Sequence, residues 1–252
     1  MYAWSSGQFN RVLGLPDHVT TCLFDLDGVL TKTAVVHAAA WKRTFDAFLD
    51  GREGQAPFDE DHDYTAYVDG KPRLDGVRSF LQSRGITLPE GTKDDAPDAE
   101  TVNGLGTRKN DLVNEVLEQQ GVDVYDGSVR YVRAVRDAGL HRAVVSSSSN
   151  TEAVLRAAGI ADLFEAVVDG VVAERENLRG KPAPDTFLAG ARAVGVESAQ
   201  AAVYEDALAG VEAGRAGAFG CVVGVNRHDA ADALREHGAD IVVDDLAELL
   251  ER

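Results

Sequence analysis

The sequence predicts an α/β protein with a doubly wound parallel sheet and an inserted α-helical domain. Two patterns predict this fold class. After residue 125, short apolar runs of strand length alternate with helix-like segments, which implies parallel strands covered by helices on both faces of the sheet. Before that point, the first apolar run stands far from the others, and the interval carries helical spacing. A separate helical unit is therefore expected inside the sheet domain.

The elements of the sheet domain follow from these patterns. Candidate strands are the apolar runs at 21–24, 143–145, 166–168, 201–204, 221–225 and 241–243. Candidate helices with a periodic apolar face lie at 128–137, 152–158, 185–194, 207–216 and 230–236. The repeated order of strand, helix and strand implies a parallel sheet that is covered on both faces.

The inserted unit shows helical apolar spacing over three stretches, 37–49, 74–84 and 109–120. Gly51 and Gly85 stand where the first two helices are expected to stop. Segment 88–106 is rich in Pro, Gly, Asp and Thr and lacks periodicity, so it predicts a long loop, either a solvated connection or a lid over a site. The expected boundaries are 1–31 and 125–252 for the sheet domain and 32–124 for a helical cap.

Charge restricts the possible partners. The chain carries 42 acidic and 25 basic side chains, a net charge of −17, which works against a broad surface for nucleic acid. A site for an anionic substrate must therefore be local. The amino terminus has no basic start followed by an apolar stretch, and no uncharged run reaches membrane-spanning length. Cys22 and Cys221 lie in apolar runs, so packing in a reducing cytoplasm is expected.

Two acidic residues, Asp25 and Asp27, follow the first strand in the segment FDLDGVLTKT. Side chains two residues apart in extended chain leave on the same side, and ligands of open parallel sheets bind at the carboxyl ends of the strands. The pair is therefore a candidate for chemistry. A plain Asp-Gly turn after a strand is the alternative.

Three later strand ends carry further polar groups. Ser146, Ser147, Ser148 and Asn150 follow the second strand, where hydroxyls and amides at a helix start could hold phosphate, although a serine run is commonly a cap. Lys181 in GKPAPD could balance a phosphate charge or could be an ordinary surface lysine. Glu205 and Asp206 close the fourth strand, and adjacent acids there indicate a cation site or solvated helix caps.

Taken in order, these four elements resemble the haloacid dehalogenase superfamily over residues 21–243, with its Rossmann-like core and a cap inserted after the first motif. The cap is similar to that of the β-phosphoglucomutases. The matching features are HAAAW with His37 and Trp41, RKN at 108–110, SSSSN and GKPAPDTF. Two departures are Ser147, where the mutases often have alanine, and the added loop from Pro89 to Gly106.

The resemblance implies a role for each matching residue. Asp25 is the expected nucleophile, Asp27 the general acid and base, and His37 and Lys109 position the acid and the sugar. Magnesium ligands are expected from the side chain of Asp25, the backbone carbonyl of Asp27, Glu205 and Asp206. Expected phosphate and substrate contacts come from Thr33, Ser146, Ser147, Lys181, Ser148, Asn150 and one of two arginines in segment 67–81, with Arg73 favoured.

The function expected from this resemblance is exchange of β-glucose 1-phosphate and glucose 6-phosphate through an aspartyl phosphate. Mg²⁺ is the expected cofactor and β-glucose 1,6-bisphosphate the intermediate or activator. A phosphatase that gives the phosphoryl group to water is the alternative, and an idle partner-binding module is a third reading. The expected partner is a small phosphorylated sugar, with no nucleic acid or membrane, and the expected assembly is a monomer or weak dimer.

Overall fold

A single parallel sheet organises the larger part of the molecule. The computed structural model describes residues 13–227 and 229–251, so most of the amino-terminal segment lies outside the described residues. The strands are β1 (Thr21–Phe24), β2 (His141–Val145), β3 (Ala166–Val168), β4 (Ala201–Glu205), β5 (Cys221–Val225) and β6 (Ile241–Val243). They pair in parallel in the order β3-β2-β1-β4-β5-β6. The predicted fold class is confirmed, and all six candidate strands are present.

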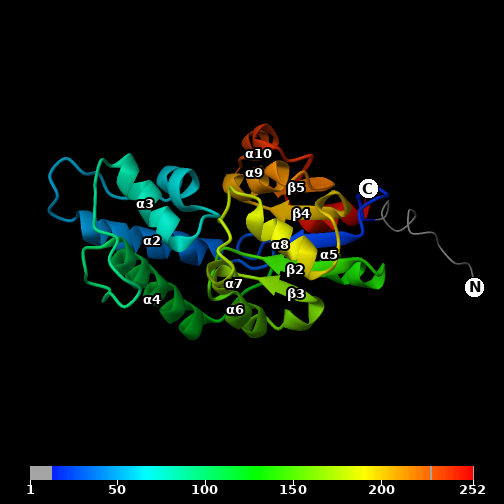
Figure 1. Cartoon of the computed structure of the whole chain (residues 1–252), viewed down its shortest axis with the longest axis horizontal. Coiled ribbons are helices and arrows are strands. Elements are labelled where there is room, and N and C mark those ends of the chain that lie inside the picture. Colours follow the sequence, from blue (N-terminus) through cyan, green and yellow to red (C-terminus); the bar gives the residue numbers. More distant parts are fainter. Residues whose placement is uncertain (1–12, 228, 252) are drawn as a thin grey trace, which may run out of the picture.

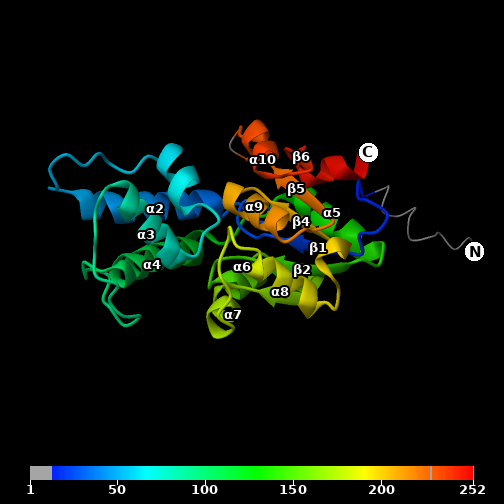
Figure 2. The ribbon, with the colours of Figure 1, turned by 45° about the horizontal axis from the view of Figure 1, so that its top comes forward.

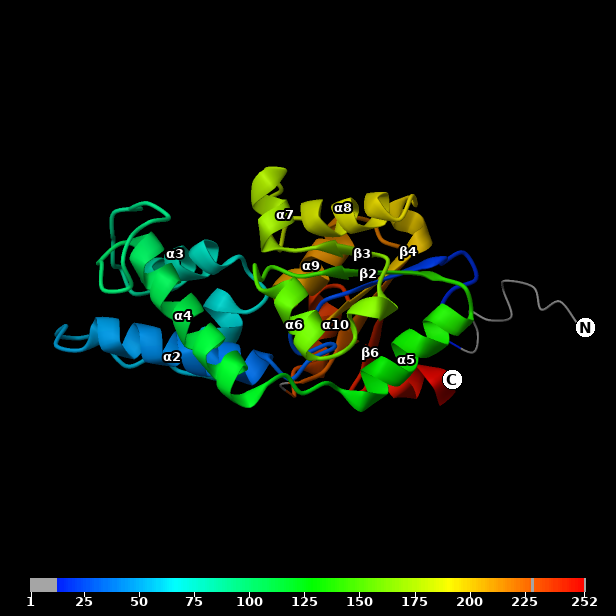
Figure 3. The same cartoon turned by 90° about the horizontal axis from the view of Figure 1, so that it is seen from below.

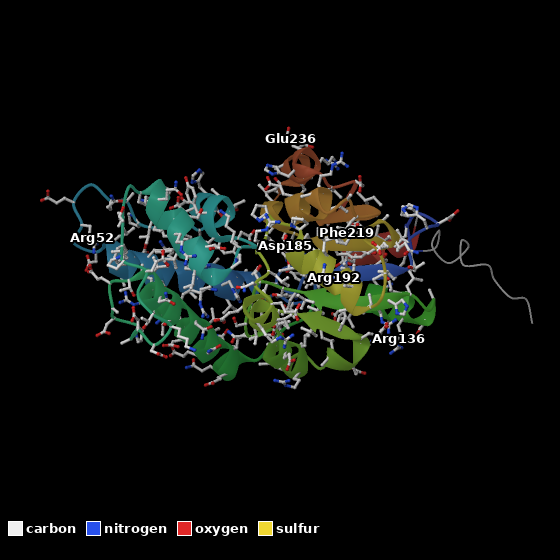
Figure 4. The ribbon with its side chains drawn as sticks, in the orientation of Figure 1. Arg52, Arg136, Asp185, Arg192, Phe219 and Glu236 are labelled. Atoms are coloured by element: carbon white, nitrogen blue, oxygen red, sulfur yellow. The ribbon has the colours of Figure 1, made fainter. Side chains whose placement is uncertain are left out.

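Helices cover both faces of the sheet, as Figure 3 shows most clearly. The first face packs against α5 (Asp126–Asp137), α6 (Thr151–Ala157) and the 3-10 helix η4 (Leu246–Glu251). The second face packs against α8 (Asp185–Ala193), α9 (Leu208–Ala216) and α10 (Ala231–His237). Neighbouring residues of β1 serve different faces, because Cys22 and Phe24 join the first cluster and Leu23 the second. Charged side chains such as Arg136 and Glu236 lie on the outer surface (Figure 4).

A helical unit lies beside the sheet and has its own apolar core (Figures 1 and 2). It contains α2 (Ala34–Leu49), the π-helix η1 (Tyr64–Val68), α3 (Arg73–Ser83) and α4 (Val102–Gln120). Aromatic rings fill this core, and the rings of Phe45 and Phe80 stack with their centroids 3.9 Å apart. None of the helices in the described part of the chain combines the length and apolar character needed to cross a membrane.

The start of α4 corrects the sequence prediction, which placed the helix at 109 and extended the loop to 106. The helix begins at Val102, because the Thr101 side chain accepts a hydrogen bond from Gly104 N at 2.9 Å and caps it. Gly104 and Gly106 made this segment resemble a loop. Their role is close packing, since a Cβ on Gly104 would lie 2.2 Å from Ala99 O and one on Gly106 2.7 Å from Leu74 Cδ2.

Five short helices among the described residues were not predicted from the sequence. They are η1, η4, α7 (Gly170–Arg175), and the 3-10 turns η2 (Ala161–Leu163) and η3 (Ser198–Gln200). Each spans three to six residues, too few to show a periodic apolar face. Asp169 caps α7 by accepting a hydrogen bond from Val172 N at 2.9 Å.

Candidate active site

Asp25 and Glu205 lie at the ends of two neighbouring strands of the sheet. Phe24 of β1 pairs with Tyr204 of β4, so Asp25 and Glu205 occupy the next level at the carboxyl edge of the sheet. Asp25 N donates to Tyr204 O at 2.9 Å, which fixes the backbone of Asp25 at the end of β1. Asp25, Glu205 and Asp206 are all buried. The parallel register therefore brings together residues that are 180 positions apart in the chain.

Lys181 connects these acids. Its Nζ donates to Asp25 Oδ1 at 2.5 Å, to Glu205 Oε1 at 2.6 Å and to the carbonyl of Val145 at 3.2 Å. An ammonium has three donors, and all three are used. Burial alone would lower the pKa of Lys181, but the two carboxylates hold it above its ordinary value. Lys181 is thus a permanent cation in contact with the predicted nucleophile.

The acid cluster suits a divalent cation. Asp25, Glu205 and Asp206 each offer an oxygen, and these atoms lie within 4.8 Å of one another. Burial and the neighbouring carboxylates raise the pKa of Asp206 well above its ordinary value, and its Oδ2 is buried without a hydrogen-bond partner. Hard oxygen donors of this kind are those Mg²⁺ prefers. Both oxygens of Glu205 already accept hydrogen bonds, from Lys181 and from Ala207 N.

A second chain of contacts holds Asp27. Thr33 Oγ1 donates to Asp27 Oδ1, and His37 Nε2 lies 3.5 Å from the same oxygen. Lys109 Nζ donates to His37 Nδ1 at 2.8 Å and lies over the ring of Trp41. The structure therefore brings Thr33 and His37, at the start of α2, and Lys109 of α4 together around Asp27.

Burial determines the protonation states of His37 and Lys109. Burial and the neighbouring Lys109 charge lower the pKa of His37 to about 4, so the imidazole is neutral near pH 7. Because Nδ1 accepts the hydrogen bond from Lys109, the ring proton is assigned to Nε2, the atom that faces Asp27. Burial and the charge of Arg73 lower the pKa of Lys109 to about 7. A proton donor thus faces Asp27 throughout the neutral range.

The serine segment after β2 forms a compact turn. Ser146 Oγ accepts from Ser148 N at 3.1 Å, and Ser148 Oγ accepts from Asn150 N at 3.2 Å. Ser147 Oγ instead donates to Gly70 O of the cap at 2.8 Å. The Ser147 hydroxyl, predicted to bind phosphate, is therefore engaged with the cap in this conformation.

Arg73 reaches the core through a residue that the sequence did not single out as a site residue. Arg73 Nη1 donates to Asn110 Oδ1 at 2.5 Å, and Asn150 Nδ2 donates to the same oxygen at 3.2 Å. Asn110 thus joins α3 to the loop after β2. Arg73 Nε is buried without a hydrogen-bond partner, so this guanidinium has a donor available. Arg78, the other arginine of this segment, is more exposed and pairs with Asp75 and Glu90.

The cap loop at 69–72 closes on the sheet domain. A Cβ on Gly180 would lie 2.0 Å from Pro72 Cγ, and one on Gly70 would lie 2.8 Å from Ala207 Cβ. Glycine is therefore required at both contacts. The closed arrangement leaves a cavity of about 600 Å³ with Asp25, Asp27 and Ser146 on its core side and Arg73 and Lys109 on its cap side.

The chain matches a known protein family that covers all the predicted site residues. The family model of haloacid dehalogenase-like hydrolases matches residues 19–217. The chain belongs to this family. The matched range contains every predicted site residue, from Asp25 to Asp206. The family resemblance predicted from the sequence is therefore confirmed.

Individual relatives place the protein more finely within the family. The chain is 57% identical over 249 residues to the β-phosphoglucomutase of Mycobacterium tuberculosis, covering 96% of this chain and 95% of the relative. It is 32% identical over 228 residues to hexitol phosphatase A of Escherichia coli, covering 90% and 91% of the two chains. The solved structure of a hydrolase from Pseudomonas syringae superposes with a TM-score of 0.77 at 22% identity, covering 92% and 97%. The protein is an enzyme of the β-phosphoglucomutase-like kind.

Asp69, in the cap loop of this enzyme, interacts electrostatically with Glu205 and Asp27, and sequence reasoning did not select it. Burial and the charges of Glu205 and Asp27 raise the pKa of Asp69 to about 7, while a hydrogen bond from Tyr64 opposes the shift. In the sequence this residue appears only as the first half of an Asp-Gly turn, as Asp27 does. The signal available was its place beside the cap arginine, in VDGKPR.

Proposed function

We propose that the enzyme interconverts β-glucose 1-phosphate and glucose 6-phosphate through an aspartyl phosphate on Asp25 and a 1,6-bisphosphate, with Mg²⁺ as cofactor. The observation that carries this proposal is the cavity between core and cap, which has the Lys181-bound Asp25 on one side and basic side chains on the other. Asp25 lines the core side and is hydrogen bonded to the buried Lys181, and Arg73 and Lys109 line the cap side. A sugar with two phosphates needs such a site, because each phosphate requires its own positive partner.

The chemistry assigned to the residues follows from their contacts. In the proposed cycle, phosphorylated Asp25 passes its phosphoryl group to the 6-hydroxyl of β-glucose 1-phosphate, and Asp27 takes the hydroxyl proton. The bisphosphate then presents its other end. Asp25 attacks the phosphorus at position 1, the bond to the sugar oxygen breaks, and Asp27 returns the proton to that oxygen. Glucose 6-phosphate leaves, and Asp25 is again phosphorylated.

Charge stabilisation comes from the surroundings of Asp25. Lys181 lies in contact with Asp25, and the amides and hydroxyls of the serine turn can face the equatorial phosphoryl oxygens. A divalent cation bound by Asp25 and Asp206 would offset the repulsion between the carboxylate and the phosphate. His37 and Thr33 hold the Asp27 carboxyl in place for proton transfer. Closure of the cap on a bound sugar would exclude water, which favours transfer to the sugar over hydrolysis.

A sugar-phosphate phosphatase is the second candidate, and the similarity to hexitol phosphatase A favours it. The two functions share every core residue and differ in the acceptor of the phosphoryl group. The higher identity to the β-phosphoglucomutase of Mycobacterium tuberculosis and the closed cap support the mutase.

One assay separates the two functions. The enzyme is incubated with Mg²⁺, β-glucose 1-phosphate and a trace of the 1,6-bisphosphate, while glucose 6-phosphate and free phosphate are followed together. Formation of glucose 6-phosphate well in excess of free phosphate supports the mutase. If free phosphate is the only product and no isomer forms, the phosphatase assignment replaces it.

A further inference from the structure

Asp69 lies in the cap loop that packs against the sheet domain just after Glu205 and Asp206. Its N–H donates to Tyr64 O at 3.0 Å, at the end of η1. The next residue, Gly70, packs on Ala207, which directly follows Asp206. Gly70 O also accepts the hydrogen bond from Ser147. Two contacts to the sheet domain thus hold Asp69 beside the end of β4 when the cap is closed.

The charges on the two sides of this contact have the same sign. After burial, the charge of Asp69 is the largest influence that raises the pKa of Asp206, and the charge of Glu205 acts in the same way on Asp69. Lys181 offsets the charges of Asp25 and Glu205 through direct hydrogen bonds. Asp206 Oδ2 is buried without a hydrogen-bond partner. Closing the cap therefore adds a further carboxylate to an already acidic cluster.

We propose that Asp69 is the contribution of the cap to the divalent-cation site. With the cap closed, its carboxylate attracts the cation held by Asp25 and Asp206 through the water bound to that ion. With no cation, the same carboxylate is repelled by Asp206 and favours the open cap. Cation binding and cap closure then strengthen each other by the same factor, because the coupling between two linked equilibria is reciprocal. This inference rests on the magnesium site of the proposed function.

A purely structural role for Asp69 makes a different prediction. The Tyr64 side chain is hydrogen bonded to the Asp69 carboxylate, and this contact could serve only to hold η1 against the loop. Tyr64→Phe removes the hydrogen bond and keeps the carboxylate, whereas Asp69→Asn removes the charge and keeps a side chain of similar shape. If the charge matters, Asp69→Asn abolishes the coupling and Tyr64→Phe leaves most of it.

The test measures Mg²⁺ binding by calorimetry and cap closure by small-angle X-ray scattering, with the full chain and Mg²⁺ alone. Asp61→Asn is the matched control, because it removes the same charge from an exposed position of the same cap. We expect Asp69→Asn to weaken Mg²⁺ binding about fivefold or more and to lose the Mg²⁺-dependent decrease in radius of gyration. The parent and Asp61→Asn should both show the full decrease in radius of gyration on adding Mg²⁺. Asp69→Glu, which keeps the charge, should show part of it.

The outcomes distinguish this inference from the proposed function. If the parent binds Mg²⁺ and Asp69→Asn binds it equally well with the same change in radius, the inference is wrong and the metal site stands. If the parent binds Mg²⁺ with no change in radius, the coupling is likewise absent. If the parent binds no Mg²⁺, the metal site fails together with the inference. Should Asp69→Asn not fold, the parent and Asp69→Glu decide between these outcomes.

Discussion

The two sides of the active site are built in different ways. The core half consists of residues at or after strand ends, together with the lysine that joins them: Asp25, Ser146, Lys181, Glu205 and Asp206. The cap half consists of residues on helices of the inserted unit: His37, Arg73, Lys109 and Asn110. Parallel register fixes the core half, and Lys181 donates hydrogen bonds at the ends of β1, β2 and β4. The cap half meets the core through few contacts, chiefly those of Gly70, Pro72 and Asn110.

This difference suits the two halves to different tasks. A rigid core half suits the chemical step, because the nucleophile and its cation must keep a constant geometry. A cap held by a small number of contacts can open to admit a sugar phosphate and close to exclude water. Changes in the core half should therefore abolish all phosphoryl transfer, whereas changes in the cap half should alter the choice of substrate and acceptor.

The largest effect is expected from Asp25→Asn. The amide cannot form an aspartyl phosphate, so turnover of sugar phosphates and of small phosphate esters should fall together by about three orders of magnitude or more. Steady-state rates on both substrate types measure this, with circular dichroism to establish that the variant is folded. More than about a tenth of the parent activity in a folded variant would show that Asp25 is not the nucleophile.

A smaller and selective effect is expected from Arg73→Ala. The distal phosphate loses a charge-assisted hydrogen bond worth roughly 1.5 to 3 kcal/mol, so isomerisation should fall more than about tenfold. Hydrolysis of a small ester that never touches the cap should persist, and the share of product released as free phosphate should rise. Arg78→Ala is the matched control, because Arg78 pairs with Asp75 and Glu90. Unaltered isomerisation in Arg73→Ala would remove this residue from the distal site.

The smallest effect concerns stability. The pKa of Lys109 is lowered from 10.5 to about 7, so between these values the unfolded chain binds a proton that the folded enzyme does not. The free energy of unfolding should therefore rise with pH in this window, by at most about 1.4 kcal/mol per pH unit from this group. Urea titrations between pH 7 and 9 should show a shallower rise for Lys109→Met than for the parent. If the free energy of unfolding rises with pH equally in both proteins, the pKa of Lys109 is not lowered by burial. Its assignment to the cap half is then weakened.

The sequence by itself predicted the sheet and the convergence of the core half. Strand ends can be read from short apolar runs, and parallel strands place their carboxyl ends at one edge. Asp25 and Glu205 were both placed at such strand ends, the resemblance assigned them to one site, and in the structure both accept a hydrogen bond from Lys181. No comparable rule predicts which residues on different helices of an inserted unit will come into contact. The contact of Lys109 with His37 was therefore expected only by resemblance.

Tertiary structure alone decided the remaining features. The early start of α4 depends on Gly104 and Gly106, whose value lies in close approach to Ala99 and Leu74 rather than in helix propensity. Asn110 joined the site because the cap brings it to Asn150, and the loop that carries Asp69 packs on Ala207 through Gly70. Local sequence encodes propensity and spacing, but the packing of a cap loop on a strand end depends on contacts between residues more than a hundred positions apart.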